Sequence, residues 1–410
     1  MIHYLDFFHE EKDTNAVFQG SKNLLNVNGH IHTPYSFSAF DSVEQAFTMA
    51  LNEDVKVLGI NDFNTFDGYP EFVEMSLKYH IFPLLNVEFM GLLEQEQKKG
   101  IRINDPLNPG RIYLSGKGCD FQPSLSAENT RKWNQIREES MIQVKKMVEK
   151  TSALLQQIDT ALILGFEEVL KNYTRGILRE RHIAKAVRLK IFDRFKDPVT
   201  RKQKLENLFG GKPLLSSLDD NVSLDNEIRA NLLKSGGAAY VKENPKAFLP
   251  LKDIIDLIID AGGIPCYPVL LDDKNGNFTE FEKDPVQLLQ SLESRGVFSI
   301  ELIPVRNDFF ALKDFVSFFV EKGFIITFGT EHNTPALDPL TVSTRGKKEL
   351  DTFLKRVNFE GACLIAYHQY LRSKGEQGIT SKDMLDAYRK DLVEKGSTII
   401  HAFLRSKQIF

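Results

Sequence analysis

Two separate parts of the chain share one rhythm, in which a short apolar run is followed by an amphipathic stretch. Each such pair predicts a strand and a helix, and repeated βα units build a parallel sheet, open or closed. The chain is therefore predicted to belong to the α/β class. The expected strands are 26–32, 55–61, 81–89, 264–268, 297–303 and 324–329, and the expected helices are 42–52, 69–80, 252–261, 284–294 and 312–322.

The segment between these two parts has a different pattern. Residues 94–250 contain long charged stretches typical of helices, and strand signals are scarce. We expect a mainly helical insertion there, interrupting a barrel made from 1–93 and 251–339. Residues 340–410 are expected to form a helical extension packed on the barrel. A chain of 410 residues fits this plan, because one large barrel needs about 250 residues.

Composition excludes several classes of protein. With 42% hydrophobic and 26% charged residues the chain can bury a core, and it has no apolar run long enough for a membrane span. The charged N-terminus, 1–15, does not resemble a signal peptide. Three scattered cysteines suit a reducing compartment, so a cytoplasmic location is expected. A net charge of −4 gives no reason to expect binding to nucleic acid or to an anionic membrane.

The strongest local motif is a pair of histidines, His30 and His32. Side chains at positions i and i+2 of a strand point to the same face, so both imidazoles can reach one metal ion at the end of the first strand. The motif is short and also occurs by chance, in which case the histidines are surface or packing residues.

Carboxylates follow other apolar runs at matching positions. Asp62, Glu88 and Glu331 each stand where an expected strand should finish. Side chains at these ends converge on one mouth of a closed barrel, where such barrels have their active sites. Imidazoles and carboxylates together suit Zn, Mn or Fe. The alternative for each carboxylate is to cap the next helix, and for Asp62 that alternative is about as good.

The order and spacing of these motifs resemble the PHP (polymerase and histidinol phosphatase) family of metal-dependent phosphoesterases. The resemblance covers residues 24–335. It implies a distorted (β/α)7 TIM-like barrel with up to three metal ions at its mouth and hydrolysis of phosphate esters. The segments that carry it are His30–Thr33, Gly59–Tyr69, Asn86–Glu88, Arg179–Ala186, Gly262–Pro268, Ile300–Leu302 and Gly329–Asn333.

Several positions depart from the family pattern. Phe63 and Tyr267 stand where the family has histidines, and the histidine expected after the third strand is replaced near Tyr113. Phenylalanine cannot bind a metal, and tyrosine is a poor ligand near neutral pH because its pKa is about 10. We therefore expect one ion, fewer than three. His30, His32, Glu88 and Glu331 remain as a coherent set, and Asp62 and Asn333 are weaker candidates.

Other residues have expected roles around this centre. Asp62, His332 and Tyr267 are candidates for acid, base or substrate contact, although His332 qualifies only if the chain has already left the strand. Glu301 could hold a ligating imidazole by a hydrogen bond, or cap a turn. By the resemblance, the insertion reaches over the mouth and offers positive charge to a phosphate through Arg179, Arg181 and His182. Their alternative role is a solvated helix face.

The expected function is hydrolysis of a small phosphorylated molecule by metal-activated water, which makes the chain a metal-dependent phosphoric ester hydrolase. Two alternatives stay open. One keeps the barrel and the metal but changes the reaction, to that of an amidohydrolase or of a sugar-acid isomerase or lyase, because several barrels share the histidine pair. The other is a degenerate barrel kept for binding or structure.

Overall fold

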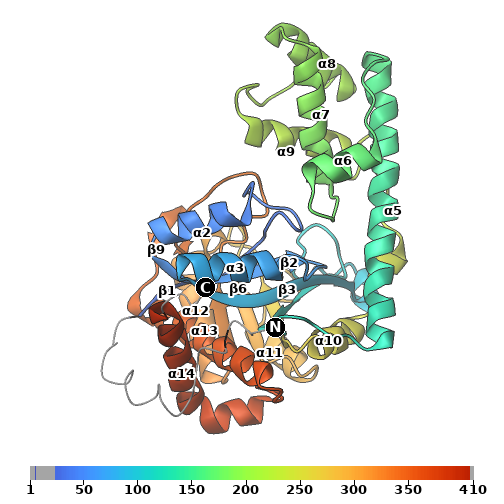
Figure 1. The fold of residues 1–410 in the computed structure, drawn as a ribbon. Helices are drawn as coiled ribbons and strands as arrows, with labels where there is room; N and C mark the ends of the chain where they lie inside the picture. Colours follow the sequence, from blue (N-terminus) through green and yellow to red (C-terminus); the bar gives the residue numbers. More distant parts are fainter. Residues whose placement is uncertain (1–4, 6–23, 407–410) are drawn as a thin grey trace.

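The apolar runs form the strands of a seven-stranded sheet in a computed structural model that describes Leu5 and residues 24–406. The strands follow chain order around the sheet, β1 to β7, so each βα unit places its strand beside the previous one. The predicted α/β class and the distorted TIM-like barrel are confirmed (Figure 1). The strands are β1 (Asn26–Ile31), β2 (Val55–Phe63), β3 (Phe82–Leu92), β4 (Arg111–Lys117), β5 (Ile264–Val269), β6 (Ser299–Leu302) and β7 (Ile325–Phe328).

The first strand and the segment after the last strand meet at the end of β1. Ile31 and Glu331 form an isolated parallel bridge. The backbone N–H of His32 donates to the carbonyl of Glu331 at 2.8 Å, and the N–H of Glu331 donates to the carbonyl of His30 at 2.9 Å. The histidine motif therefore lies where the first and last parts of the barrel meet.

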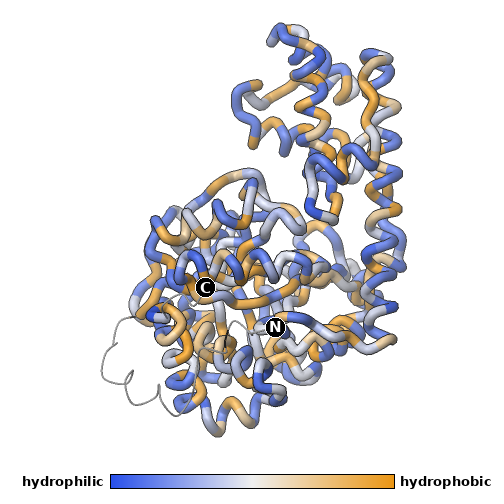
Figure 2. The backbone as a smooth tube through the Cα atoms, viewed as in Figure 1, coloured by the Kyte–Doolittle hydropathy of each residue, from blue (hydrophilic) through white to orange (hydrophobic). Residues whose placement is uncertain are grey.

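Helices cover the outside of the barrel, and their buried apolar residues form one core with those of the strands. Polar and apolar residues alternate along these helices (Figure 2). The helix α10 illustrates this: Ile254, Leu257 and Ile258 are buried, whereas Ile259 on the opposite face is exposed. Among the described residues no helix is both long and apolar enough to cross a membrane. The barrel helices are α2 (Val43–Asn52), α3 (Tyr69–Tyr79), α4 (Glu94–Lys98), α10 (Leu251–Asp260), α11 (Pro285–Glu293) and α12 (Phe309–Glu321).

The strand β4 was not predicted, and it lies within the segment expected to be a helical insertion. It runs antiparallel to both neighbours, β3 and β5. Its sequence, Arg111–Lys117, is short and carries a cation at each end, which hides the apolar alternation of Ile112 and Leu114. The helical part starts later than position 94, because its first long helix begins at Ala127.

The helices of the insertion have a hydrophobic core of their own. The long helix α5 leaves the barrel and carries the smaller helices at its far end (Figure 1). Ser126 caps it by accepting a hydrogen bond from the N–H of Asn129. The helices are α5 (Ala127–Ile158), α6 (Phe166–Tyr173), α7 (Glu180–Arg194), α8 (Pro198–Leu208) and α9 (Asn221–Leu232).

Two long helices end the described chain, α13 (Thr352–Ser373) and α14 (Lys382–Arg405). The first packs against β7 and β1, and the second packs on the first. Glycines permit both contacts, because a side chain at Gly361 would overlap the carbonyl of Ile326, and one at Gly396 would overlap the carbonyl of Cys363. Apart from Leu5, the charged N-terminal segment, residues 1–15, lies outside the described residues.

We predict that Gly396→Ala destabilises the protein although alanine favours helices. The new methyl group would force α14 away from α13, and overpacking of this kind costs about 1–3 kcal/mol. Chemical denaturation followed by circular dichroism measures the change. Gly165→Ala is the control, since its methyl group would have 3.6 Å to the nearest atom. Equal stability of Gly396→Ala and the natural chain would contradict this packing.

Candidate metal centre

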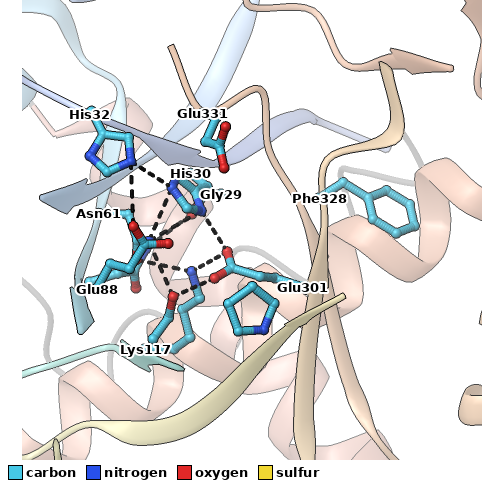
Figure 3. Close-up of polar contacts among 12 residues, drawn as sticks. Gly29, His30, His32, Asn61, Glu88, Lys117, Glu301, Phe328 and Glu331 are labelled. Carbon is cyan, nitrogen blue, oxygen red and sulfur yellow. Dashed lines mark hydrogen bonds and ion pairs between the residues drawn. The ribbon is translucent and has the colours of Figure 1, made fainter. Parts of the chain in front are cut away.

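His30 and His32 face each other across a short gap at the barrel mouth. His30 belongs to β1, and His32 follows the last residue of that strand. Their Nε2 atoms are 3.4 Å apart, and both residues are buried. The expected i, i+2 arrangement of the two imidazoles is present (Figure 3).

Neighbouring side chains fix which nitrogen of each imidazole carries the proton. Glu301 on β6 accepts a hydrogen bond from His30 Nδ1 at 2.9 Å. Ser36 donates to Asp62 at 2.6 Å, so its oxygen is free to accept from His32 Nδ1 at 3.3 Å. Both Nε2 lone pairs therefore point into the gap. The expected contact between Glu301 and a ligating imidazole is present.

Glu88 on β3 completes a three-residue group. The ligand atoms of His30, His32 and Glu88 all lie within 4.8 Å of one another. Glu88 Oε2 is 3.8 Å from His32 Nε2. Burial, together with the charges of Glu331 and Glu301, raises the pKa of Glu88 well above its ordinary value. Burial and the nearby His30 lower the pKa of His32, so this imidazole is neutral near pH 7.

A fully buried lysine lies directly below this group. Lys117 on β4 contacts Glu301 at 2.5 Å and donates to Asn61 Oδ1 at 3.2 Å. Burial alone would raise the pKa of Glu301, but the charge of Lys117 and the contact with His30 outweigh burial and lower it. Glu301 is therefore a carboxylate bound to a cation (Figure 3).

The sequence interpretation missed Lys117, Ser115 and Asn61. Tyr113, Ser115 and Lys117 alternate along β4 and so share one face, which is the signal that could have identified them. Ser115 donates to Glu301 at 2.5 Å. The amide nitrogen of Asn61 is 3.1 Å from both ring nitrogens of His30. Because Nδ1 donates to Glu301, the nitrogen that accepts from Asn61 is Nε2, and a bound ion would replace this hydrogen bond.

Glu331 lies at the rim of the same cavity but outside the three-residue group. The chain turns sharply there, with positive φ at Glu331 and His332. The Glu331 carboxylate forms an ion pair with Arg306 and accepts a hydrogen bond from Asn333 at 2.8 Å. Glu331 therefore contacts Arg306 and Asn333 rather than the imidazoles. Neither Glu331 nor Asn333 joins the three ligand atoms.

Asp62 faces away from the three ligand atoms. The strand β2 continues to Phe63, two residues beyond the predicted end at Asn61, and because side chains alternate along a strand, Asp62 lies on the opposite face from Asn61. It accepts hydrogen bonds from Thr33 and Ser36. Burial raises the pKa of Asp62 to about 7. Its contribution is indirect, through the Ser36 hydroxyl that orients His32.

His332 and Tyr267 also lie elsewhere than expected. Both nitrogens of His332 are occupied, by Thr330 and by the carbonyl of Asp338, each at 2.7 Å. Tyr267 is buried on the outer face of β5, where its hydroxyl donates to Glu282 at 2.8 Å. The inner face of β5 at that level is occupied by its neighbour Cys266, which pairs with Ser115. Both residues are structural in this arrangement.

The three expected phosphate-binding residues of the insertion differ in position. His182 caps α7, because its Nδ1 accepts a hydrogen bond from the N–H of Arg179 at 3.0 Å, and burial with nearby Arg179 lowers its pKa to about 4. It therefore offers no positive charge near pH 7. The Arg179 guanidinium lies 4.7 Å from the ring centre of Phe63. Arg181 donates to Asn226 at 3.0 Å, and its charge acts on both His32 and Glu331.

A cavity of about 760 Å³ opens beside His30 and Glu88. Glu301 and Glu331 line it as well, whereas His32 lies behind its wall. Charged side chains of both signs from the barrel loops and the insertion complete the lining. The cations are Arg102, Arg111, Arg229, Lys234, Lys274, Arg306 and Arg345, and the further carboxylates are Asp105, Asp272 and Asp273.

The donor set fits a divalent metal ion. The two imidazoles direct their Nε2 atoms into the gap, and Glu88 supplies a carboxylate whose buried charge needs a cation nearby. Three protein ligands beside an open cavity are typical of catalytic sites, which keep a coordination position free. Glu301 holding His30 is the usual support for a ligating imidazole. His30, His32 and Glu88 are therefore the residues that could hold the ion.

Comparison with known proteins shows the fold but not the family. No protein-family model and no curated protein sequence matches the chain. A crystal structure from Bifidobacterium adolescentis, of a candidate metal-dependent phosphoesterase, aligns with a TM-score of 0.53 and 15% identity, covering 82% of this chain and 96% of that one. An amidohydrolase from Chromobacterium violaceum, with bound sulfate and no metal, aligns with a TM-score of 0.49 and 13% identity, covering 81% and 96%. Membership of the PHP family is not confirmed.

We predict that Lys117→Met destabilises the protein by about 3–5 kcal/mol, because it leaves the Glu301 carboxylate buried without its cation. Adding Glu301→Gln should recover part of the loss. Since the pKa of Glu301 is lowered, the contribution of the pair is present above the ordinary carboxyl pKa and is lost as the pH falls below it.

Urea denaturation of both variants between pH 3 and pH 7 measures these effects. Lys78→Met is the matched control, because its ion pair with Glu44 is exposed and worth at most about 1 kcal/mol. Equal losses from Lys117→Met and Lys78→Met would show that the buried pair does not hold the centre together.

Proposed function

We propose that the chain is a metal-dependent phosphoesterase that hydrolyses a small phosphorylated molecule with one divalent ion, Zn, Mn or Fe. The observation that carries the proposal is the convergence of His30 Nε2, His32 Nε2 and the Glu88 carboxylate beside a cavity whose lining includes Arg306, Arg229 and Lys234. The barrel likeness to a candidate metal-dependent phosphoesterase is consistent with it. The composition favours the cytoplasm as the location.

A bound divalent ion would lower the pKa of water and polarise a phosphate oxygen. The chain's own residues then have three tasks. His30 and His32 keep their lone pairs directed into the gap, through Glu301 and Ser36. Glu88 neutralises part of the ion's charge. Arg306, which is 41% exposed in the lining of the same cavity, can turn from Glu331 to the oxygens of the phosphate.

The buried Lys117 supports a count of one ion. Its ammonium group already supplies the positive charge that the Glu301 carboxylate requires, and it occupies the space between Glu301 and Asn61. Two neighbouring cations would repel each other strongly in this buried setting. The residues that stand where the family has histidines, Phe63 and Tyr267, add no ligand either. A second ion at Glu301 therefore has neither a free carboxylate nor room.

The first test is turnover of p-nitrophenyl phosphate with added Mn²⁺ or Zn²⁺. We expect hydrolysis in the natural chain and a loss of at least about a hundredfold in kcat/KM for His32→Ala and Glu88→Gln. Arg306→Gln should keep the metal and raise KM, since it removes a phosphate contact only.

The control for the histidine variant is His80→Asn. His80 ends α3 with a φ of 53°, a conformation that asparagine also adopts, and it lies outside the centre. It should keep full activity. If the natural chain turns over no phosphate ester in the presence of these ions, the proposed reaction is wrong.

Metal binding should displace a proton from Glu88 and strengthen as the pH rises. The raised pKa of Glu88 means that this group holds its proton to a higher pH when no cation is bound, whereas the pKa of His32 is lowered and this imidazole competes less with protons. Affinity should increase by up to about tenfold per pH unit until the pKa of Glu88 is reached. Titration calorimetry in two buffers with different ionisation enthalpies counts the protons. Affinity that does not change between pH 5 and pH 7 would contradict this assignment of Glu88.

A further inference from the structure

The cavity has a second group of cations that comes from the insertion rather than from the barrel. Arg229 and Lys234 line it together with His30 and Glu88, although they are far from them in sequence. Arg181 lies beside them, at the start of α7. We refer to Arg181, Arg229 and Lys234 as the insertion cluster.

Packing between α7 and α9 holds this cluster in place. Arg188 on α7 forms a buried bidentate ion pair with Asp225 on α9, at 2.6 and 3.1 Å. Ile183 and Ile228 lie in the core between the helices. Arg229 is in the last turn of α9, where cations are favoured by the helix dipole. Arg181 and Arg229 are thus placed by two packed helices, and Lys234 follows the end of α9.

The positive charge of the insertion cluster exceeds the negative charge of the carboxylate paired with it. Its shared carboxylate is Glu180, 3.1 Å from Lys234 Nζ and 4.0 Å from Arg229 Nη2. In the described part of the chain no other carboxylate forms an ion pair with the cluster. Arg229 Nε is buried without a hydrogen-bond partner among those residues. Three cations and one carboxylate leave a charge of about +2, which matches the charge of a phosphate monoester near pH 7.

The same charge imbalance is visible in the titration of Arg181. Burial and the nearby Arg229 lower its pKa to about 10, and the charges of Glu180 and Glu331 offset only part of this effect. Arg181 remains charged near pH 7, but burial and repulsion from Arg229 destabilise its charged form. An anion placed among these groups would relieve the repulsion between Arg181 and Arg229.

We infer that the substrate carries a second phosphate group, bound by the insertion cluster, while the ester to be cleaved lies over His30, His32 and Glu88 beside Arg306. This inference rests on the proposed function and specifies its substrate class as small bisphosphorylated molecules. The cavity joins the two regions, since both line it, and its volume of about 760 Å³ accommodates such a molecule.

The test compares two ligands with the same six-carbon chain, hexyl phosphate, which has one phosphate, and hexane-1,6-diol bisphosphate, which has two. Calorimetry on the full chain without metal measures binding and prevents turnover. We expect the bisphosphate to bind about tenfold more tightly, because each charge-assisted contact with phosphate contributes substantially. This advantage should be lost in Arg229→Gln and in Lys234→Gln. Lys234 is 46% exposed, so its variant should fold even if the other does not.

Lys190→Gln is the matched control, because Lys190 also belongs to α7 but pairs with Glu168 outside the cavity. It should keep the full preference for the bisphosphate. Equal binding of the two ligands by the natural chain, or an unchanged preference in both cluster variants, would overturn the inference. A cluster-dependent preference in a protein that hydrolyses no phosphate ester would keep the inference and refute the proposed reaction.

Discussion

The centre depends on one buried carboxylate, Glu301, and on the cation that stabilises it. A carboxylate buried inside the barrel is unstable without a compensating charge. Lys117 supplies that charge, at 2.5 Å from Glu301. The other oxygen of Glu301 accepts a hydrogen bond from Ser115, and the carboxylate also holds His30. The orientation of the first imidazole therefore follows from an ion pair that lies below it.

Barrel closure brings the remaining parts together. The backbone bonds of Glu331 with His30 and His32 fix the end of β1, and the side chains of His30 and Glu331 line the cavity. The insertion then places further cations above the mouth. Positive charge is thus arranged at three levels, with Lys117 below the ligand atoms, Arg306 beside them and the insertion cluster above. This arrangement suits a substrate with more negative charge than one ester phosphate.

Much of the fold could be predicted from periodicity, because the parallel strands are apolar on both faces and lie between clear helices. The strand β4 could not, since it is short, charged and antiparallel. At the centre, strand register predicted His30, His32, Glu88 and the partner role of Glu301. The prediction treated Asp62 as the residue that follows the strand. In the structure β2 continues to Phe63, so Asp62 lies within the strand and alternation turns its side chain to the face opposite Asn61. Lys117 was missed because β4 was not predicted, and without that strand its alternation with Tyr113 and Ser115 has no meaning; a lysine in a sequence is otherwise nearly always a surface residue. The opposite orientations of Cys266 and Tyr267 likewise depend on the register of β5 against β4.

The central claim is that His30, His32 and Glu88 bind one divalent ion at the barrel mouth. Anomalous scattering from crystals grown with Mn²⁺ or Zn²⁺ tests it directly, because the method locates and counts the ions. The account predicts one peak, at about 2.1 Å from both Nε2 atoms and from a Glu88 oxygen when the ion is zinc. The absence of a peak there, or a second peak beside Glu301 in the space that Lys117 occupies, would contradict it.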